Sequence, residues 1–321
     1  MKLGVFTVLM AQFSLEDTLK RLQQLDVKMV ELGCAGYPGN AHCNPDILLN
    51  DDKAVEELKS LIAKYDMQIS ALSCHANPVH PNKQIAKDFD DGIRNTILLA
   101  EKLGINQINT FSGCPGDSDG SKYPNWVTCP WPDDFLTILD YQWNEVLIPY
   151  WKDLVAFAKQ HGVTKIALEM HPGFCVYNTG TLLRLREAVG PEIGANFDPS
   201  HLIWQGMDPV ASIKKLGDAI FHFHAKDTKV DPYNTAVNGV LDAASYADVL
   251  NRAWVFRTVG YGSDAGKWKD IISALKAVGY DYAISIEHED GLMSIDEGLS
   301  KACEFLNSLI IKESAGDAWW I

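Results

Sequence analysis

The chain lacks the features that mark membrane, secreted and nucleic-acid-binding proteins. No segment approaches the roughly 20 uninterrupted apolar residues of a membrane span. The chain begins with a strand-like stretch from Leu3 to Leu9, without the basic region, long apolar segment and cleavage site that are typical of a signal peptide. The 28 Lys and Arg residues are outnumbered by 42 Asp and Glu residues, which gives a net charge of −14. Such a surface disfavours the neutralisation of many phosphates. We therefore expect a cytoplasmic protein with no membrane or nucleic-acid partner.

Paired cysteines, a nucleotide-binding loop and domain linkers are also missing. The seven cysteines are odd in number, widely spread and never arranged as C-x-x-C, which argues against a disulfide framework or a structural zinc site. No glycine-rich loop opens a helix after the first predicted strand, so a nucleotide cofactor has little support. With 321 residues, 47% of them hydrophobic, the chain can bury one large core. We expect a single domain over residues 1–321.

Strand-like and helix-like segments alternate along the whole chain, which predicts βα units around a parallel sheet. Eight short apolar runs suit strands buried on both faces: Lys2–Val8, Lys28–Gly33, Gln68–Cys74, Gln107–Phe111, Lys165–Met170, Ile193–Phe197, Ala219–Ala225 and Tyr282–Glu287. The predicted helices are Ser14–Asp26, Asp52–Tyr65, Lys83–Leu103, Tyr141–His161, Thr181–Ala188, Pro209–Leu216, Lys267–Val278 and Ile295–Leu309. Eight parallel units predict closure into an α/β fold of the (β/α)₈ TIM-barrel type.

Two connections are long. One runs from Ser112 to about Asp140 after the fourth strand, and the other from Lys226 to about Gly266 after the seventh. Both follow the C-terminal end of a strand, the side on which a barrel builds its active site. They are candidate lids, and ordered decoration or subunit contacts are the alternative.

The fifth to eighth strands end in acidic residues or histidines, in the stretches A-L-E-M-H-P-G, A-N-F-D-P-S-H, F-H-F-H-A-K-D and I-S-I-E-H-E-D. Neighbouring strand ends lie roughly 5 Å apart, so side chains from all four can converge on one ion. The candidate metal ligands are Glu169, Asp198, His224 and Glu287, with Glu289 as an alternative to Glu287. Three carboxylates and one imidazole suit Mn²⁺ or Mg²⁺ and tolerate Co²⁺, Zn²⁺ or Fe²⁺.

The seventh strand places several polar side chains on one face. Alternation puts His222, His224 and Lys226 on the same side. A polar face so deep in a strand is costly unless a metal or a substrate satisfies it. Glu31 and Asn109, at other strand ends, face the same end of the barrel.

These strand ends resemble those of the xylose-isomerase-like TIM-barrel superfamily, the sugar-phosphate isomerase and epimerase group, over nearly the whole chain. The resemblance implies one divalent metal, commonly Mn²⁺, bound by the four candidate ligands, with adjacent oxygens of a small carbohydrate or keto-sugar completing the coordination. It also favours a homo-oligomer. The apolar tail from Glu313 to Ile321 is a candidate contact, either with another subunit or folded back on its own barrel.

Several reactions begin with the same step on such a site. A metal polarises the carbonyl of an α-hydroxy-ketone while a carboxylate or imidazole removes the α-proton. Reprotonation gives an epimer or an isomer, whereas expulsion of a β-oxygen makes the enzyme a lyase. The ketose 3-epimerases of the superfamily use two metal-bound glutamates, which Glu169 and Glu287 match, but they continue as H-x-x-[DE]-x-x-R after the seventh strand. Here Val230 stands where those epimerases have arginine.

The motif that begins at His224 has the form H-x-K-D. This form is instead similar to the 2-keto-myo-inositol dehydratase branch and to relatives that eliminate from 3-keto-glycosides. We therefore carry two readings: a sugar or sugar-phosphate isomerase or epimerase, and a lyase or dehydratase acting on a keto-sugar, keto-cyclitol or 3-keto-glycoside. The catalytic candidates are Glu169, Glu287, Lys226 and His201. The substrate-binding candidates are His75, Asn109, His171 and Arg257.

Two of these candidates have structural alternatives. Lys226 would bind a keto or leaving-group oxygen, or else pair with Asp227 or with a carboxylate of the site. Arg257 would grip a carboxylate or phosphate through its planar guanidinium, or else stack on Trp254 or Tyr261. Two further possibilities for the whole chain are the DNA-repair branch of the superfamily, which binds a histidine-rich zinc cluster, and a barrel that binds without catalysis.

Overall fold

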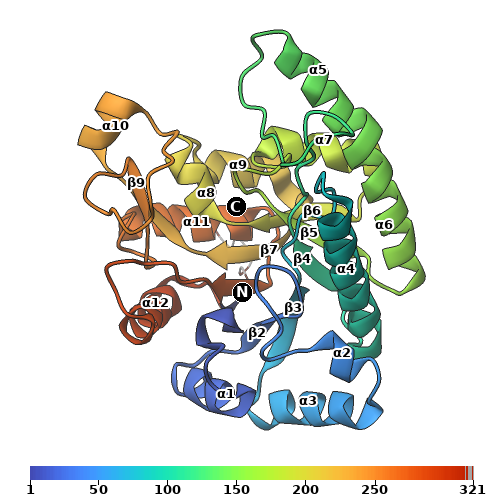
Figure 1. The fold of residues 1–321 in the computed structure, drawn as a ribbon. Coiled ribbons are helices and arrows are strands. Elements are labelled where there is room, and N and C mark those ends of the chain that lie inside the picture. Colours follow the sequence, from blue (N-terminus) through green and yellow to red (C-terminus); the bar gives the residue numbers. More distant parts are fainter. Residues whose placement is uncertain (315, 317–319, 321) are drawn as a thin grey trace.

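Eight parallel strands close into a barrel in the order β1-β10-β7-β6-β5-β4-β3-β2 (Figure 1). The barrel strands are β1 (Lys2–Phe6), β2 (Met29–Gly33), β3 (Gln68–Ser73), β4 (Gln107–Thr110), β5 (Lys165–Glu169), β6 (Ile193–Phe197), β7 (Ile220–Ala225) and β10 (Ala283–Ile286). The computed structural model describes residues 1–314, 316 and 320. The predicted TIM barrel is confirmed. The predicted contact of the tail falls largely on 315, 317–319 and 321, outside the described residues.

Helices cover the outside of the barrel and bury their apolar faces against it, as Trp151 of α6 and Trp268 of α11 do without any exposure. The covering helices are α1 (Leu15–Gln24), α3 (Asp52–Lys64), α4 (Lys83–Leu103), α6 (Ile148–Gln160), α7 (Thr179–Val189), α9 (Pro209–Leu216), α11 (Ala265–Ala277) and α12 (Ile295–Leu309). Shorter helical segments are η1 (Thr7–Met10), α2 (Pro45–Leu48), α5 (Asp134–Asp140), η2 (Tyr141–Leu147), α8 (Pro199–Trp204), η3 (Gly217–Ala219) and α10 (Pro232–Asn238). In the described part of the chain, no helix is both long and apolar enough to cross a membrane.

The predicted boundaries were wrong at two places near the barrel mouth. The first strand ends at Phe6 instead of Val8, because the chain turns into η1, where the Thr7 hydroxyl donates to the Glu31 carbonyl. The helix expected from Tyr141 begins at Asp134, since α5 continues through the π-helical η2 into α6. The last part of the predicted fourth loop is therefore helical.

The connection after β7 has structure of its own, which we call the β8–β9 excursion (residues 227–263). Its strands β8 (Asp227–Val230) and β9 (Trp254–Arg257) pair antiparallel, with α10 between them, and it projects beside the barrel mouth at the left of Figure 1. Buried Asp227 fixes its base. The Asp227 Oδ2 atom accepts hydrogen bonds from the Trp268 indole and from the backbone N–H groups of Gly260, Gly262 and Ser263.

Candidate metal centre

The four candidate ligands meet at the C-terminal mouth of the barrel. One donor atom from each lies within 4.8 Å of the others: Glu169, Asp198, His224 and Glu287. The strands set this arrangement, because β5, β6, β7 and β10 are successive neighbours in the barrel and each contributes one ligand at its end. Of the two glutamates left open by the sequence, Glu287 belongs to the group, whereas Glu289 stands at its rim with a side chain that is 48% exposed.

Lys226 supplies positive charge within this group. Its Nζ atom lies 2.7 Å from Glu287 Oε2, 3.1 Å from Glu289 Oε2 and 3.2 Å from Asp198 Oδ2. Burial would lower the pKa of Lys226, but attraction to these carboxylates outweighs it and holds the pKa well above its ordinary value. Lys226 therefore pairs with carboxylates of the site and not with Asp227.

The buried carboxylates of the mouth outnumber its permanent cations. Glu31, Glu169 and Asp198 are buried, and Glu287 is nearly so, while Lys226 is the one Lys or Arg that contacts them among the described residues. Asp198 Oδ2 accepts no hydrogen bond from the described residues, although it lies near Lys226. Buried charge in this excess is costly without a further cation. The donor set therefore fits a hard divalent ion.

The glutamates that line the site are held ionised. Burial would raise the pKa of Glu169, but its close contacts with His201, His224 and His75 outweigh it and keep the pKa well below its usual range. Burial likewise opposes ionisation of Glu287, and attraction to Lys226 and His224 lowers its pKa to about 2. Both side chains are therefore carboxylates, the form that binds a metal ion.

His224 is held from behind by Glu31. Its Nε2 atom lies 2.9 Å from Glu31 Oε2, while its Nδ1 atom faces Glu169 Oε2 at 3.3 Å and Glu287 Oε2 at 3.4 Å. Glu31 also accepts hydrogen bonds from Ser73 Oγ, Asn109 Nδ2 and Ser285 Oγ. A carboxylate behind a ligating histidine orients the ring and strengthens it as a ligand.

The sequence predicted that Glu31 faces the same end of the barrel as the candidate ligands, but it did not predict that Glu31 supports His224. No local signal does so, because Glu31 and His224 are 193 residues apart in the chain.

His222 and Asn109 lie deeper in the barrel. His222 Nε2 contacts Ser70 Oγ at 3.1 Å, and His222 Nδ1 contacts Asn196 Oδ1 at 3.1 Å and Asn109 Nδ2 at 3.2 Å. Burial lowers the pKa of His222 to about 4, so its ring is neutral. The expectation that a metal or a substrate satisfies this face of the seventh strand stays a prediction: neighbouring side chains hydrogen-bond to His222, and Glu31, His222 and His224 also lie close enough together to hold an ion. Asn196 was missed, although its position two residues before Asp198 puts it on the same face.

Histidines other than His224 also lie around Glu169. His201 Nε2 lies 3.0 Å from Glu169 Oε1, and His75 Nε2 lies 3.0 Å from Glu169 Oε2. The His171 ring lies 4.1 Å from that of His201, measured between centroids. Burial lowers the pKa of both His171 and His201, so neutral imidazoles are available there to accept or donate a proton.

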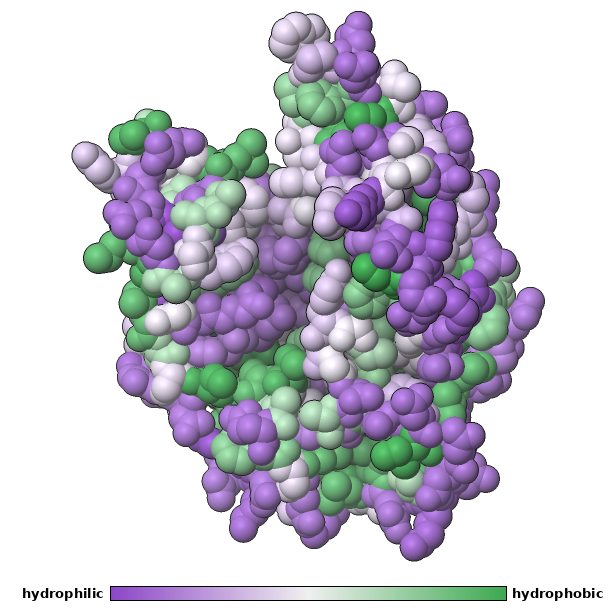
Figure 2. All heavy atoms as spheres, in the orientation of Figure 1, coloured by the Kyte–Doolittle hydropathy of each residue, from purple (hydrophilic) through white to green (hydrophobic). Residues whose placement is uncertain are grey.

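Two cavities open at the mouth. A cavity of about 200 Å³ adjoins the ligand group and is lined by Glu169, Lys226 and Glu287, and a cavity of about 500 Å³ lies against the β8–β9 excursion. His171 and Glu289 line both cavities. Figure 2 shows the face hollowed between the excursion, on the left, and the part that carries α5, at the upper right, with hydrophilic residues on its floor.

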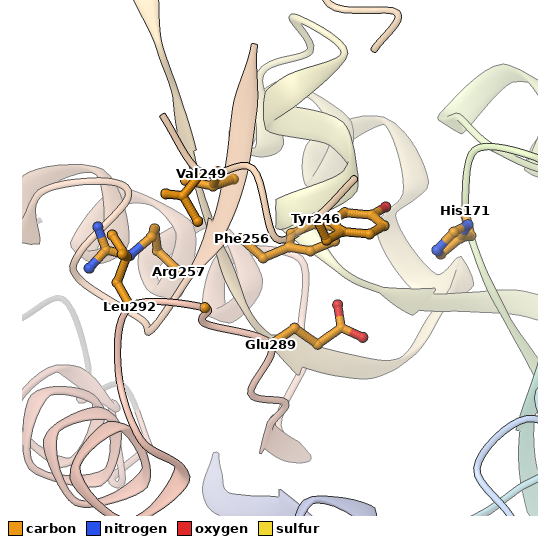
Figure 3. A pocket seen from close by; sticks show the side chains of 9 residues that line it. His171, Tyr246, Val249, Phe256, Arg257, Glu289 and Leu292 are labelled. Carbon is orange, nitrogen blue, oxygen red and sulfur yellow. The ribbon is translucent and has the colours of Figure 1, made fainter. Parts of the chain in front are cut away.

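Arg257 lies in the wall of the larger cavity (Figure 3). Its Nε atom donates to Asp290 Oδ1 and Oδ2 at 3.1 and 3.0 Å, and its guanidinium lies 5.6 Å from the centre of the Tyr261 ring. The smaller cavity beside the ligands is not lined by Arg257. The structure thus brings every candidate except Arg257 and the deeper Asn109 to the immediate surroundings of the ligand group.

Comparison with known proteins gives a family match over most of the chain. The sequence model described as xylose isomerase-like TIM barrel matches residues 19–309. The uncharacterised protein YfiH of Bacillus subtilis (strain 168) is 40% identical over 312 residues, which cover 97% of this chain and 99% of YfiH. Inosose dehydratase of Geobacillus thermodenitrificans (strain NG80-2) is 24% identical over 190 residues, which cover 58% of this chain and 61% of the dehydratase.

Solved structures share the fold. A structure of the protein IolI with a bound zinc atom superposes with a TM-score of 0.67 at 17% identity, covering 98% of this chain and all of that one. Other structures with the same fold include a D-tagatose 3-epimerase-like protein, a D-psicose 3-epimerase and a probable 3-DHS dehydratase, at 12 to 22% identity. At such identities the likeness concerns the fold alone.

Proposed function

The chain belongs to the xylose isomerase-like TIM-barrel family, and on this premise we propose that it is a divalent-metal-dependent isomerase or epimerase of a sugar or sugar phosphate. The observation that carries the proposal is the convergence of Glu169, Asp198, His224 and Glu287 at the barrel mouth, with more buried carboxylates than cations. Mn²⁺ is the proposed ion, and the IolI structure, which shares the fold, contains a bound zinc atom. When bound, the ion would polarise the substrate carbonyl and stabilise the enediolate.

The proposed roles of the side chains follow from their positions. Glu169, at the end of β5, and Glu287, after β10, approach the ligand group from strands that β6 and β7 separate. One carboxylate removes the α-proton and the other returns a proton on the opposite face of the substrate. His201, within hydrogen-bonding distance of Glu169 Oε1, orients that carboxylate and exchanges protons with it.

Lys226 supports a second candidate, a lyase or dehydratase. Its ammonium group is already at the site, within 2.7 to 3.2 Å of three carboxylates. An ammonium there is placed to protonate a departing β-oxygen, which an elimination needs and an epimerisation does not. The similarity to an inosose dehydratase points the same way.

Proton NMR in D₂O tests both candidates. The Mn²⁺-loaded protein and a Glu169→Gln control are incubated with ketohexoses, keto-inositols and 3-keto-glycosides. We expect deuterium beside the carbonyl and an epimer or isomer that retains every oxygen. Loss of water or of an alcohol, with a new enone signal that the control lacks, would establish the lyase. Absence of exchange with every substrate would contradict both.

A further inference from the structure

The larger cavity is lined mainly by apolar side chains of the β8–β9 excursion and of the loop after β10. Its lining includes Tyr246, Val249, Phe256, Arg257, Glu289 and Leu292. Its volume of about 500 Å³ falls within the usual range of small-molecule sites, whereas the cavity beside the ligands, at about 200 Å³, is below that range. The space for a small molecule is therefore larger beside the four candidate metal ligands than directly over them.

Aromatic side chains join the two cavities. The Phe256 ring lies under Lys226 Nζ, 4.7 Å from it, and edge-on to the His201 ring at 5.3 Å. The Phe256 ring also stacks on Tyr246, with ring centres 5.9 Å apart and an interplanar angle of 17° (Figure 3). Any part of a substrate that extends from the candidate metal ligands past Glu289 therefore contacts an aromatic surface. Arg252 lies over the Tyr246 ring, 4.3 Å from its centre, but Tyr246 is still 62% exposed, so part of its ring remains available for contact.

The charges in the cavity wall are already paired. Arg257 is bound to Asp290, and Glu289 is bound to Lys226. Of the described lining residues, none offers an unpaired Lys or Arg to a phosphate or carboxylate. The cavity therefore suits an uncharged group with a flat apolar face, since such a face stacks on aromatic rings.

We propose that the substrate has two parts: a polar part that is bound beside Glu169 and Glu287, and an uncharged ring substituent that occupies the cavity against Tyr246 and Phe256. This narrows the substrate from free or phosphorylated sugars to sugars that carry a second ring. The assignment of the polar part rests on the proposed function, whereas that of the ring rests on the cavity.

Matched ligands test the second part by itself. Methyl, phenyl and glucosyl β-D-glucosides are titrated into the Mn²⁺-loaded protein and into the metal-free protein by calorimetry. We expect the phenyl or the glucosyl compound to bind at least about tenfold more tightly than the methyl compound, the size of effect that one aromatic contact with its buried area produces. The compound that gains most identifies the ring as aromatic or as a second sugar.

Two tyrosines of the excursion give a matched pair of variants. Tyr246→Ala removes the exposed ring of the cavity and should reduce the preference over the methyl glucoside to about threefold or less. Tyr233→Ala removes a ring of α10 that is 77% exposed and does not line the cavity, and it should leave the preference unchanged.

Equal affinities for the three compounds, or a preference that survives in Tyr246→Ala, would overturn the proposed ring site. A ring preference without any binding of Mn²⁺ would instead overturn the proposed metal chemistry and leave the ring site standing.

Discussion

At the scale of single residues, the support behind His224 distinguishes this site from a mere group of carboxylates. Glu31 is fully buried and its four neighbours each give it a hydrogen bond, so its position is fixed before any ligand arrives. It holds Nε2 of His224 and leaves Nδ1 directed at Glu169 and Glu287. Glu31 thus acts as a positioning residue whose effect should appear in metal affinity.

We expect Glu31→Gln to weaken Mn²⁺ binding by about 10- to 100-fold, the usual effect of losing the partner behind a ligating histidine. Calorimetric titration of the metal measures this directly, without any substrate. Glu101→Gln is the matched control, because Glu101 forms a similar pair with His161, at 2.8 Å, on the outside of the barrel. A change of less than about twofold in Glu31→Gln would reduce Glu31 to a structural role.

For Lys226 we expect a substitution to have the opposite effect on metal affinity. Its ammonium lies among the same carboxylates that a metal ion would use, so it competes with the ion for their charge. We expect Lys226→Gln to bind Mn²⁺ severalfold more tightly and yet to lose at least about 100-fold in kcat if Lys226 protonates an oxygen in the reaction. Lys229→Gln, an exposed lysine of β8, serves as the control. Weaker metal binding in Lys226→Gln would contradict the competition.

At the scale of elements, the β8–β9 excursion depends on one buried carboxylate. Asp227 Oδ2 receives four N–H donors from the segment between β9 and α11 and from α11 itself. In Asp227→Asn, the amide N–H₂ would face these N–H donors. If the amide turned, other donors would lose their acceptor. We expect a loss of about 2 to 4 kcal/mol in the free energy of unfolding.

Denaturant unfolding followed by fluorescence measures this loss. Asp231→Asn is the control, since Asp231 caps α10 by accepting the Asn234 N–H and asparagine caps a helix about as well. A loss below about 0.5 kcal/mol for Asp227→Asn would mean that the excursion is held by other contacts, such as the stacking of Trp204 on Trp254.

The elements also mark what the sequence could reveal. The barrel strands were predictable because each is a short apolar run between helical stretches, and the candidate ligands because each follows such a run. The pairing of β8 with β9 was not, because Asp227 and Arg257 are opposite in the sheet but separated by the whole excursion. The same holds for Glu31, whose partners come from distant strands. Patterns of neighbouring residues show where a strand ends, and long-range contacts decide what its last side chain touches.

At the scale of the whole molecule, the charge distribution predicts how metal acts on stability. The chain carries a net charge of −14, and several of its carboxylates are buried together at the barrel mouth. A divalent ion that binds only the folded state would stabilise it by about 2.7 kcal/mol at a concentration 100 times its Kd. Removal of metal with a chelator should therefore lower the thermal midpoint, and addition of Mn²⁺ should restore it.

The size of this shift should depend on the ligand group alone. In Glu169→Gln the site loses one charge and one donor, so added Mn²⁺ should raise the midpoint much less than in the unaltered protein. The metal-free variant itself need not be less stable, because it carries one buried negative charge fewer in a group that already has too many. An equal Mn²⁺ shift in both proteins would place the stabilising ion outside the barrel mouth, and would remove the charge argument on which the proposed metal centre rests.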